Sequence, residues 1–283
     1  MIRIPEFGFD GQVVLITGAT SGIGREAAIA FARAGADLVL VARRASVLAK
    51  VAKETRALGS DTLTVPTDVS KAADVKACFG KAMKRFGRID LVINNAGVLI
   101  PSPVVEIRRS DFQAMLNVNL FGAMHVMQAA VPLMREQGHG HIVNVGSLAG
   151  RRGFSPLGAY SATKFALVGL TEALRTELVG ENIHISLVLP SVVDTPMAAV
   201  AQASLADLDG EQADVWPDNL NLPTSWVVTA IFAAVKLRLT EVAVPPGAGL
   251  IEKLAALTPG ATDKLLRWTT DTATRAARRR RDG

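Results

Sequence analysis

Tyr160 and Lys164 stand four residues apart in the segment Tyr160-Ser-Ala-Thr-Lys164, and Tyr160 is the only tyrosine in the chain. On a helix this spacing places both side chains on one face, where they can touch. A free phenol has a pKa of about 10, and a neighbouring ammonium stabilises the phenolate and should lower that value. The pair therefore predicts a general base toward an alcohol, or a general acid toward a carbonyl.

A glycine-rich loop, Thr17-Gly-Ala-Thr-Ser-Gly-Ile-Gly24, follows the first apolar run and precedes the first helical stretch. Its glycines at positions 18, 22 and 24 let the chain turn sharply and bring backbone N–H groups close to a diphosphate. The N-terminus of the next helix attracts the same anion. A glycine string alone is often a plain turn, but its place between a strand and a helix indicates dinucleotide binding.

The elements that must position these residues alternate along the chain. Short β-branched runs lie at 13–16, 38–41, 62–65, 91–93, 141–145, 183–189 and 241–244. Stretches of helical period lie at 22–34, 46–58, 71–86, 110–137, 157–180 and 224–238. Continuous apolar runs suit strands covered on both faces, and the alternation indicates βαβ units. We therefore expect an α/β fold, a single-domain doubly wound parallel sheet of about seven strands with helices on both faces.

The composition excludes several classes of protein. Hydrophobic residues make up 49% and charged residues 20% of the 283, which is too apolar for intrinsic disorder. The single cysteine, Cys78, excludes an intrachain disulfide and a cysteine-based metal site, and it favours a reducing compartment. The first residues do not resemble a signal peptide, and no uncharged apolar run reaches the roughly 18 residues of a membrane-spanning helix. We expect a cytoplasmic protein without a membrane span or a bound metal.

The C-terminal part differs from the rest in charge and spacing. We expect residues 1–245 to form the main domain, including a functional connection at 190–223, and residues 246–283 to form an extension with an Arg-rich tail. Residues 275–282 carry a net +4 of the chain's formal +5, so the basic excess is a tail and not a surface stripe. A solvated C-terminus is the favoured interpretation. We expect no nucleic-acid partner, while a peripheral membrane contact through the tail stays open.

Residues at further fixed positions resemble the short-chain dehydrogenase/reductase family, which has a Rossmann-type fold. These are the spacing Gly18-x-x-x-Gly22-x-Gly24, Asn94-Asn-Ala-Gly97 after the fourth run, Asn119 in the long helix, Ser147 after the fifth run, and Tyr160 with Lys164. The motifs span residues 17–195. One departure is Ser191, where the family usually has glycine. Because serine does not adopt a positive φ as cheaply, the loop beside the nicotinamide is expected to differ in shape.

The resemblance implies a role for each catalytic residue. Tyr160 exchanges the proton, and Lys164 both stabilises the phenolate and holds the nicotinamide ribose. The Ser147 hydroxyl fixes the substrate oxygen near Tyr160. Asn119 anchors a water that links Lys164 to solvent, with a purely structural role in its helix as the alternative.

The resemblance also implies a dinucleotide site. The implied contacts are Gly18, Ser21, Gly22, Ile23, Gly24, Asn95, Ala96, Gly97, Tyr160, Lys164 and Thr195, with Asp68 and Val69 at the adenine. The acidic position of NAD-dependent relatives is Ala42 here, and it is followed by Arg43 and Arg44, which suit bidentate contact with a 2′-phosphate. We therefore expect NADP. The alternatives are a solvated arginine pair and, for Asp68, a cap on the following helix.

Together these features predict an NADP-dependent oxidoreductase that interconverts an alcohol and a ketone or aldehyde. Residues 196–223, the expected lid, contain acidic and apolar side chains but no Lys or Arg, which favours a neutral, lipophilic small-molecule substrate. Arg151 and Arg152 could rim the cleft and reverse this preference. The alternatives are a reductase of 3-oxoacyl thioesters and a dinucleotide-binding regulatory protein without turnover. The helices at 110–137 and 157–180 resemble those that pair relatives into homodimers or homotetramers.

Overall fold

The computed structural model describes residues 8–208, 221–250, 257, 258 and 260. Within this part of the chain, one seven-stranded parallel sheet has the order β3-β2-β1-β4-β5-β6-β7. The strands are β1 Val13–Thr17, β2 Asp37–Ala42, β3 Thr62–Pro66, β4 Leu91–Asn94, β5 Gly140–Val145, β6 Ile183–Pro190 and β7 Glu241–Val244. The predicted doubly wound sheet is confirmed.

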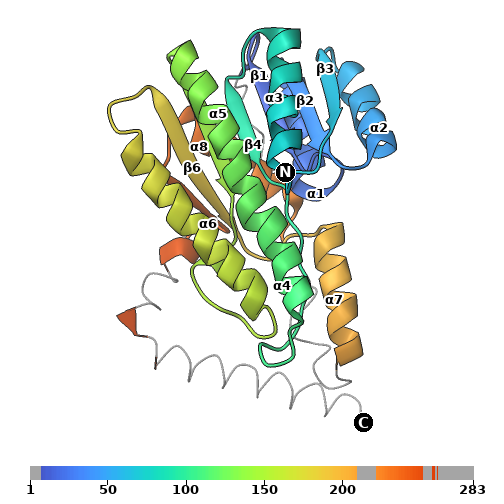
Figure 1. Ribbon diagram of the computed structural model, residues 1–283, viewed down its shortest axis with the longest axis vertical. Helices are drawn as coiled ribbons and strands as arrows, with labels where there is room; N and C mark the ends of the chain where they lie inside the picture. The colour runs from blue at the N-terminus through green and yellow to red at the C-terminus, as the bar shows by residue number, and fades with distance from the viewer. Residues whose placement is uncertain (1–7, 209–220, 251–256, 259, 261–283) are drawn as a thin grey trace.

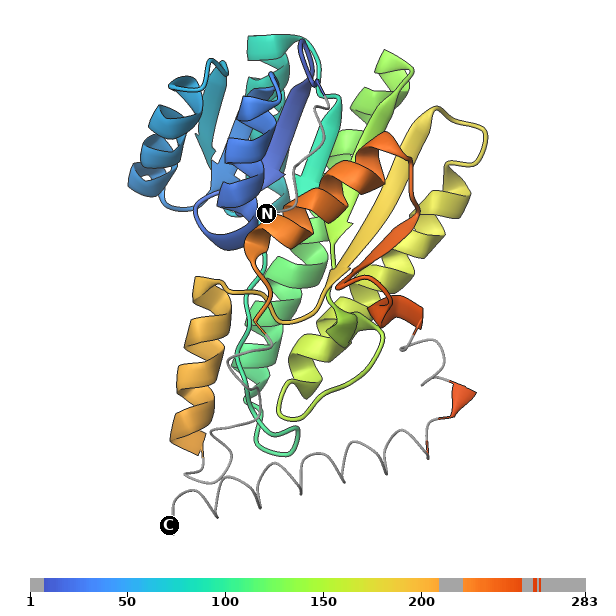
Figure 2. The same ribbon diagram turned by 180° about the vertical axis from the view of Figure 1, so that it is seen from behind.

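Helices cover both faces of the sheet. They are α1 Gly22–Arg33, α2 Ala45–Arg56, α3 Ala72–Phe86, α4 Arg109–Leu116, α5 Ala123–Gln137, α6 Gly158–Glu177, α7 Pro196–Leu208 and α8 Thr224–Lys236. Helices α3, α4, α5 and α6 lie in front of the sheet in Figure 1. Seen from behind, α1 and α8 cross the opposite face (Figure 2). Helix α7 projects beyond the strands' carboxyl ends, beside α4.

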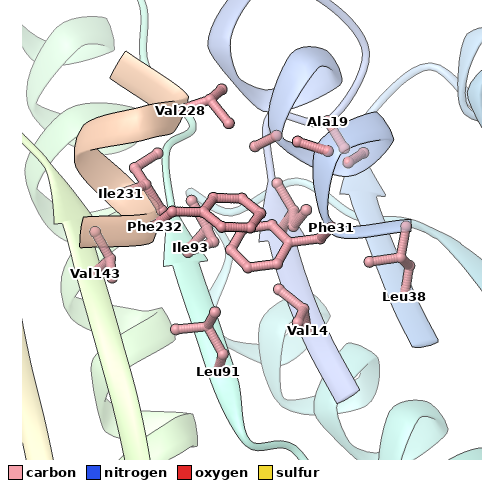
Figure 3. Packing of buried hydrophobic residues seen from close by; sticks show 14 of the residues in the cluster. Val14, Ala19, Phe31, Leu38, Leu91, Ile93, Val143, Val228, Ile231 and Phe232 are labelled. Atoms are coloured by element: carbon pink, nitrogen blue, oxygen red, sulfur yellow. The ribbon is translucent and has the colours of Figure 1, made fainter. Parts of the chain in front are cut away.

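The packing of the core explains why the strands appear in the sequence as continuous apolar runs. In β1, Val14 and Ile16 enter the cluster under α1 and α8, whereas Val13 and Leu15 enter the cluster on the opposite face. All four side chains are almost fully buried, so each face of the strand is covered by apolar contacts, and the one polar residue, Thr17, stands at its carboxyl end. On the α1/α8 face, the rings of Phe31 and Phe232 stack with centroids 4.4 Å apart (Figure 3).

Two elements differ from the prediction. The stretch expected as one helix at 110–137 is interrupted by a π-helical segment, η1 Asn117–Gly122, between α4 and α5. The connection 190–223 contains the thirteen-residue helix α7. Proline at its first position and an Ala-rich sequence both favour a helix there. Residues 209–220, which carry much of the expected lid, lie outside the described residues.

The stretch Arg109–Gln137 is long and apolar enough to cross a membrane, with a mean hydropathy of 1.2 over its best 18-residue window. This criterion for a membrane-spanning helix considers only length and composition. In the fold the stretch packs along the sheet and buries Met115, Val126 and Met134 in the core. Core helices of α/β proteins meet the same criterion, so the stretch is weak evidence for a membrane span. The predicted boundary at residue 245 follows β7 directly and remains a prediction, because most of the extension 246–283 lies outside the described residues.

Candidate active site

A cavity of about 300 Å³ opens at the carboxyl ends of the strands, where β1 and β4 are neighbours and the strand order reverses. Open α/β sheets bind ligands at such a switch point. The predicted cofactor residues that line it are Gly18, Ser21, Gly22, Ile23, Arg43, Arg44, Asp68, Val69, Asn95, Ala96, Gly97 and Thr195. Gly24, Tyr160 and Lys164 are not among its lining residues.

Sequence reasoning missed several lining residues. They are Thr20, Thr67, Val98, Val118, Pro196 and Met197. Thr20 lies between two glycines of the loop, and Thr67 and Val98 flank motifs already named, so extending each motif by one or two residues would have found them. Val118 stands between Asn117 and Asn119, and no periodicity signal distinguishes it.

The glycine loop is shaped by close backbone contacts. A Cβ on Gly24 would collide with the carbonyl oxygen of Gly18 and would lie 2.7 Å from Nδ2 of Asn95. Gly18 itself has a φ of +69°, and a Cβ on it would lie 2.9 Å from the same Nδ2 of Asn95. Asn95 in turn donates from Nδ2 to the Thr17 carbonyl at 3.0 Å, and its backbone N–H donates to Thr17 Oγ1 at 2.9 Å. The loop is therefore a compact cradle at the N-terminus of α1, which suits a diphosphate.

The two arginines expected at the 2′-phosphate lie at the far end of the cavity. Arg43 and Arg44 are both exposed, and Arg44 reaches Thr20 Oγ1 at 3.5 Å. Asp68 accepts hydrogen bonds from Ser70, at 3.1 Å from N and 2.7 Å from Oγ. Although partial burial opposes it, these bonds and the nearby Arg43 hold the pKa of Asp68 below its usual range. Asp68 thus shapes the turn before α3 while also lining the cavity, and its adenine contact stays a prediction.

Ser147 and Tyr160 lie next to each other, and Val98, which lines the cavity, packs against the apolar cluster that contains Tyr160. Ser147 directly follows Gly146 after β5, and Tyr160 lies in the first turn of α6. Their side chains are hydrogen-bonded, and Ser147 Oγ also accepts from the Ala149 N–H at 3.1 Å. Burial raises the pKa of Tyr160 to about 12, and the bond to Ser147 only partly offsets this. The chain's own groups therefore do not lower the phenol pKa, because desolvation outweighs them, and the lowering expected from the ammonium together with an oxidised nicotinamide stays a prediction.

Lys164 lies on the same face of α6 as Tyr160, as the spacing predicts. Its Nζ is 5.7 Å from the centre of the Tyr160 ring and donates to the Val145 carbonyl at 3.1 Å. The side chain is 4% exposed, and this burial lowers the pKa of the ammonium to about 8. The structure therefore brings Ser147, Tyr160 and Lys164 together as one group.

Asn119 occupies the π-helical segment η1 and is 1% exposed. Its Oδ1 accepts from the Val98 N–H at 2.8 Å, while its Nδ2 donates to the Val98 carbonyl at 2.9 Å and to Thr163 Oγ1 at 3.1 Å. The side chain thus ties the segment after β4 to α6. This is the structural role held as the alternative, and the water-anchoring role stays a prediction.

The segment after β6 closes one side of the cavity. The Thr195 methyl would lie 2.9 Å from a Cβ on Gly22, and the Met197 Cε 3.8 Å from a Cβ on Gly97. Ser191 is not among the described non-glycine residues with positive φ, and its N–H donates to the Val244 carbonyl at 2.8 Å. Serine at this position is therefore accommodated without left-handed strain.

Arg151 does not supply a free positive charge to the cleft, contrary to one expectation. Its guanidinium bonds Glu172 of α6 at 2.7 Å and also Glu241 of β7. Tyr160 is surrounded instead by apolar side chains. That cluster contains Met115, Ala149 and Leu157, with Val98, Leu99, Ile100, Ile107, Phe154 and Ala159 packed against it.

Comparison with known proteins agrees with this geometry. Residues 12–206 match the family model described as short chain dehydrogenase. The chain is 35% identical over 265 residues to "Ketoacyl reductase HetN" of a Nostoc species, covering 91% of this chain and 89% of that protein.

Two solved structures are also similar. A short-chain dehydrogenase/reductase from Burkholderia phymatum in complex with NAD has a TM-score of 0.81 and 31% identity, covering 90% of this chain and 96% of that one. A variant of actinorhodin polyketide ketoreductase with NADPH has a TM-score of 0.77 and 29% identity, covering 84% and 97%. The match to the family model spans more than half of the chain, and the HetN relative is similar over nearly its whole length. The chain belongs to the short-chain dehydrogenase/reductase family.

Proposed function

We propose that the protein is an NADP-dependent oxidoreductase that interconverts an alcohol and a ketone or aldehyde, with Tyr160 as the general acid and base. The observation that carries the proposal is the Ser147–Tyr160–Lys164 group, which adjoins the glycine-lined cavity through Val98: Val98 lines the cavity and packs against the cluster that contains Tyr160. NADPH, when bound, supplies the hydride that reduces the carbonyl carbon. The glycine cradle of Gly18, Gly22 and Gly24 fits its diphosphate.

The protein's own residues handle the proton. In reduction, the Tyr160 hydroxyl donates its proton to the substrate oxygen, and in oxidation the phenolate takes it back. The Ser147 hydroxyl, already hydrogen-bonded to Tyr160, holds the substrate oxygen beside the phenol. The Lys164 ammonium, 5.7 Å from the ring centre, stabilises the phenolate. Asn119 orders the segment between Val98 and α6, and we keep its water-anchoring role as part of the proposal.

The cofactor preference rests on Ala42, Arg43 and Arg44. A carboxylate at position 42 would repel a 2′-phosphate, whereas the two exposed arginines at the cavity attract it. One charged hydrogen bond contributes about 1.5–3 kcal/mol, so NADPH should be preferred by roughly tenfold or more. The test is to measure the Michaelis constants for NADPH and NADH in the wild type and in Arg43→Ala. Arg33→Ala is the control, because Arg33 is an exposed arginine at the end of α1. Equal use of NADH by the wild type refutes the assignment.

The substrate proposed is neutral and lipophilic. Tyr160 lies among apolar side chains, and Arg151 is already neutralised by two carboxylates. Specificity constants should therefore favour a neutral hydrophobic ketone over a carboxylate of matched length. A clear preference for the anion would refute this part of the proposal.

Reduction of 3-oxoacyl thioesters is the second candidate. The relative named ketoacyl reductase, which aligns with 91% of this chain, favours it. The same panel of carbonyl compounds, extended to steroids and acyl thioesters, separates the two candidates. Oxidation of NADPH with none of them would favour a regulatory protein without turnover.

The remaining proposals concern the setting of the enzyme. Cys78 is buried and unpaired with another cysteine, as suits a reducing compartment, and we propose a cytoplasmic homodimer or homotetramer. Burial raises the pKa of the Cys78 thiol to about 11, which keeps it unreactive. Sedimentation of the purified protein tests the oligomeric state, and a monomer would contradict it.

A further inference from the structure

Arg151 connects three elements that lie far apart in the sequence: the turn after β5, helix α6 and strand β7. Its Nη2 donates to Glu172 on α6 at 2.7 Å and to Glu241, the first residue of β7. The side chains of Arg151 and Glu241 are 27% and 19% exposed, whereas that of Glu172 is 47% exposed, so the Arg151–Glu241 pair is the shielded one. Ion pairs shielded in this way are screened less by salt than exposed ones. The three residues therefore form a clasp between the turn after β5, helix α6 and the edge strand β7.

The turn that the clasp holds is the one that carries Ser147. The Gly150 N–H donates to the Ser147 carbonyl at 2.9 Å, and the Arg151 N–H donates to the Leu148 carbonyl at 2.9 Å. Arg151 is thus the last residue of a single short turn, η2 Leu148–Gly150 with its flanks, that begins at Ser147. Because the turn is so short, movement at Arg151 is transmitted to Ser147.

The same turn packs against the backbone of α6 at Lys164 and shares an apolar cluster with Tyr160. A Cβ on Gly150 would lie 2.9 Å from the carbonyl oxygen of Lys164, so the turn packs directly against α6 at that residue. Ala149 belongs to the apolar cluster that buries Tyr160. The position of the turn therefore governs both the Ser147–Tyr160 hydrogen bond and the exclusion of water from the phenol.

We propose that Arg151 is a positioning residue for the active site: through Glu172 and Glu241 it holds the turn after β5 against α6, and so fixes Ser147 beside Tyr160. The catalytic part of this inference rests on the proposed function. The positioning part does not, because it concerns the protein's own groups and can be measured without turnover.

The test compares Arg151→Met with Arg135→Met. Methionine keeps an apolar stem of similar shape and removes the charge. Arg135 is the matched control, because it makes an exposed ion pair with Glu181 at 2.7 Å, near the opposite end of the sheet. A triple variant, Arg151→Met with Glu172→Gln and Glu241→Gln, removes the clasp without leaving the two carboxylates uncompensated.

Two readouts separate positioning from general stability. In Arg151→Met, kcat should fall by about tenfold with little change in the KM for NADPH, since misplacement remote from the chemistry can cost up to about a hundredfold. Tyrosinate absorbance gives the second readout, because Tyr160 is the only tyrosine in the chain. Burial raises the pKa of Tyr160 by more than the bond to Ser147 lowers it. A turn loosened enough to admit water should therefore move the phenol titration down toward its usual value, even though the Ser147 bond is lost. Arg135→Met should leave both readouts as in the wild type.

A folded Arg151→Met with wild-type kcat and titration overturns the proposal, and so does a fall in melting temperature alone. If Arg151→Met does not fold, the triple variant decides by the same two readouts. Failure of both to fold overturns the proposal, since the clasp would then serve the fold and not the site. If the wild type reduces no carbonyl compound, the proposed function fails and the titration alone decides here.

Discussion

The alkaline titration of Tyr160 is the most direct consequence of the site's burial. Tyr160 is 9% exposed, and desolvation raises the pKa of its phenol to about 12, above the usual value of about 10. This difference in pKa corresponds to about 3 kcal/mol of preference for the neutral phenol. At pH 11, about one tenth of Tyr160 should be ionised in the folded protein, against about nine tenths of a solvent-exposed tyrosine.

The assay is the ultraviolet absorbance of tyrosinate between pH 8 and pH 11.5. A single tyrosine makes the signal unambiguous, and Tyr160→Phe provides the baseline. Circular dichroism at each pH shows whether the protein is folded, and the urea-unfolded chain should titrate near about 10. Half-ionisation near 10 in the folded protein would refute the argument, because it would mean that water reaches the phenol.

Two further predictions concern the loop and the sheet. Gly24→Ala should weaken NADPH binding by roughly tenfold or more, since its Cβ would collide with the Gly18 backbone and such overpacking costs about 1–3 kcal/mol. Gly169→Ala is the control, because the position lies in α6 with open space around it; it should leave NADPH binding intact and raise the free energy of unfolding by about 0.5–1 kcal/mol. Calorimetry measures the binding of NADPH, and urea titrations measure the free energy of unfolding. Normal affinity for NADPH in Gly24→Ala would contradict the first prediction. Burial, aided by His184 and Arg238, lowers the pKa of His141 from 6.5 to about 3. The folded state thus binds fewer protons there than the unfolded chain, so this contribution to stability is present above about pH 6.5 and is lost progressively as the pH falls toward 3. The free energy of unfolding, measured between pH 7 and pH 4, should fall less steeply in His141→Gln, and equal slopes would count against the burial argument.

Local patterns predicted the elements of the fold well. The central strands are covered on both faces, so they are short and largely apolar, as Val13–Thr17 shows. The glycine loop could also be predicted from the sequence, because the contacts that require glycine at position 24 are made partly with residues of the same loop, in addition to Asn95. Tyr160 and Lys164 could be paired from spacing alone, since a helix fixes which residues share a face.

Features that depend on contacts between residues far apart in the sequence could not be predicted. The π-helical segment is stabilised by Asn119 bonding Val98 and Thr163, which lie 21 and 44 residues away in the chain. Arg151 looked available to a substrate, but its partners lie 21 and 90 residues further along. The high pKa of Tyr160 also depends on the whole cluster around it and not on Lys164 alone. Neither periodicity nor spacing carries information of this kind.

The central claim is that the Tyr160 hydroxyl transfers the proton, and Tyr160→Phe tests it most directly because only one oxygen is removed. With NADPH and the best carbonyl substrate of the panel, we expect kcat to fall by at least about a hundredfold, the low end for a general acid or base. The melting temperature and the affinity for NADPH should stay close to those of the wild type. Retention of more than about a tenth of the wild-type kcat would contradict the account.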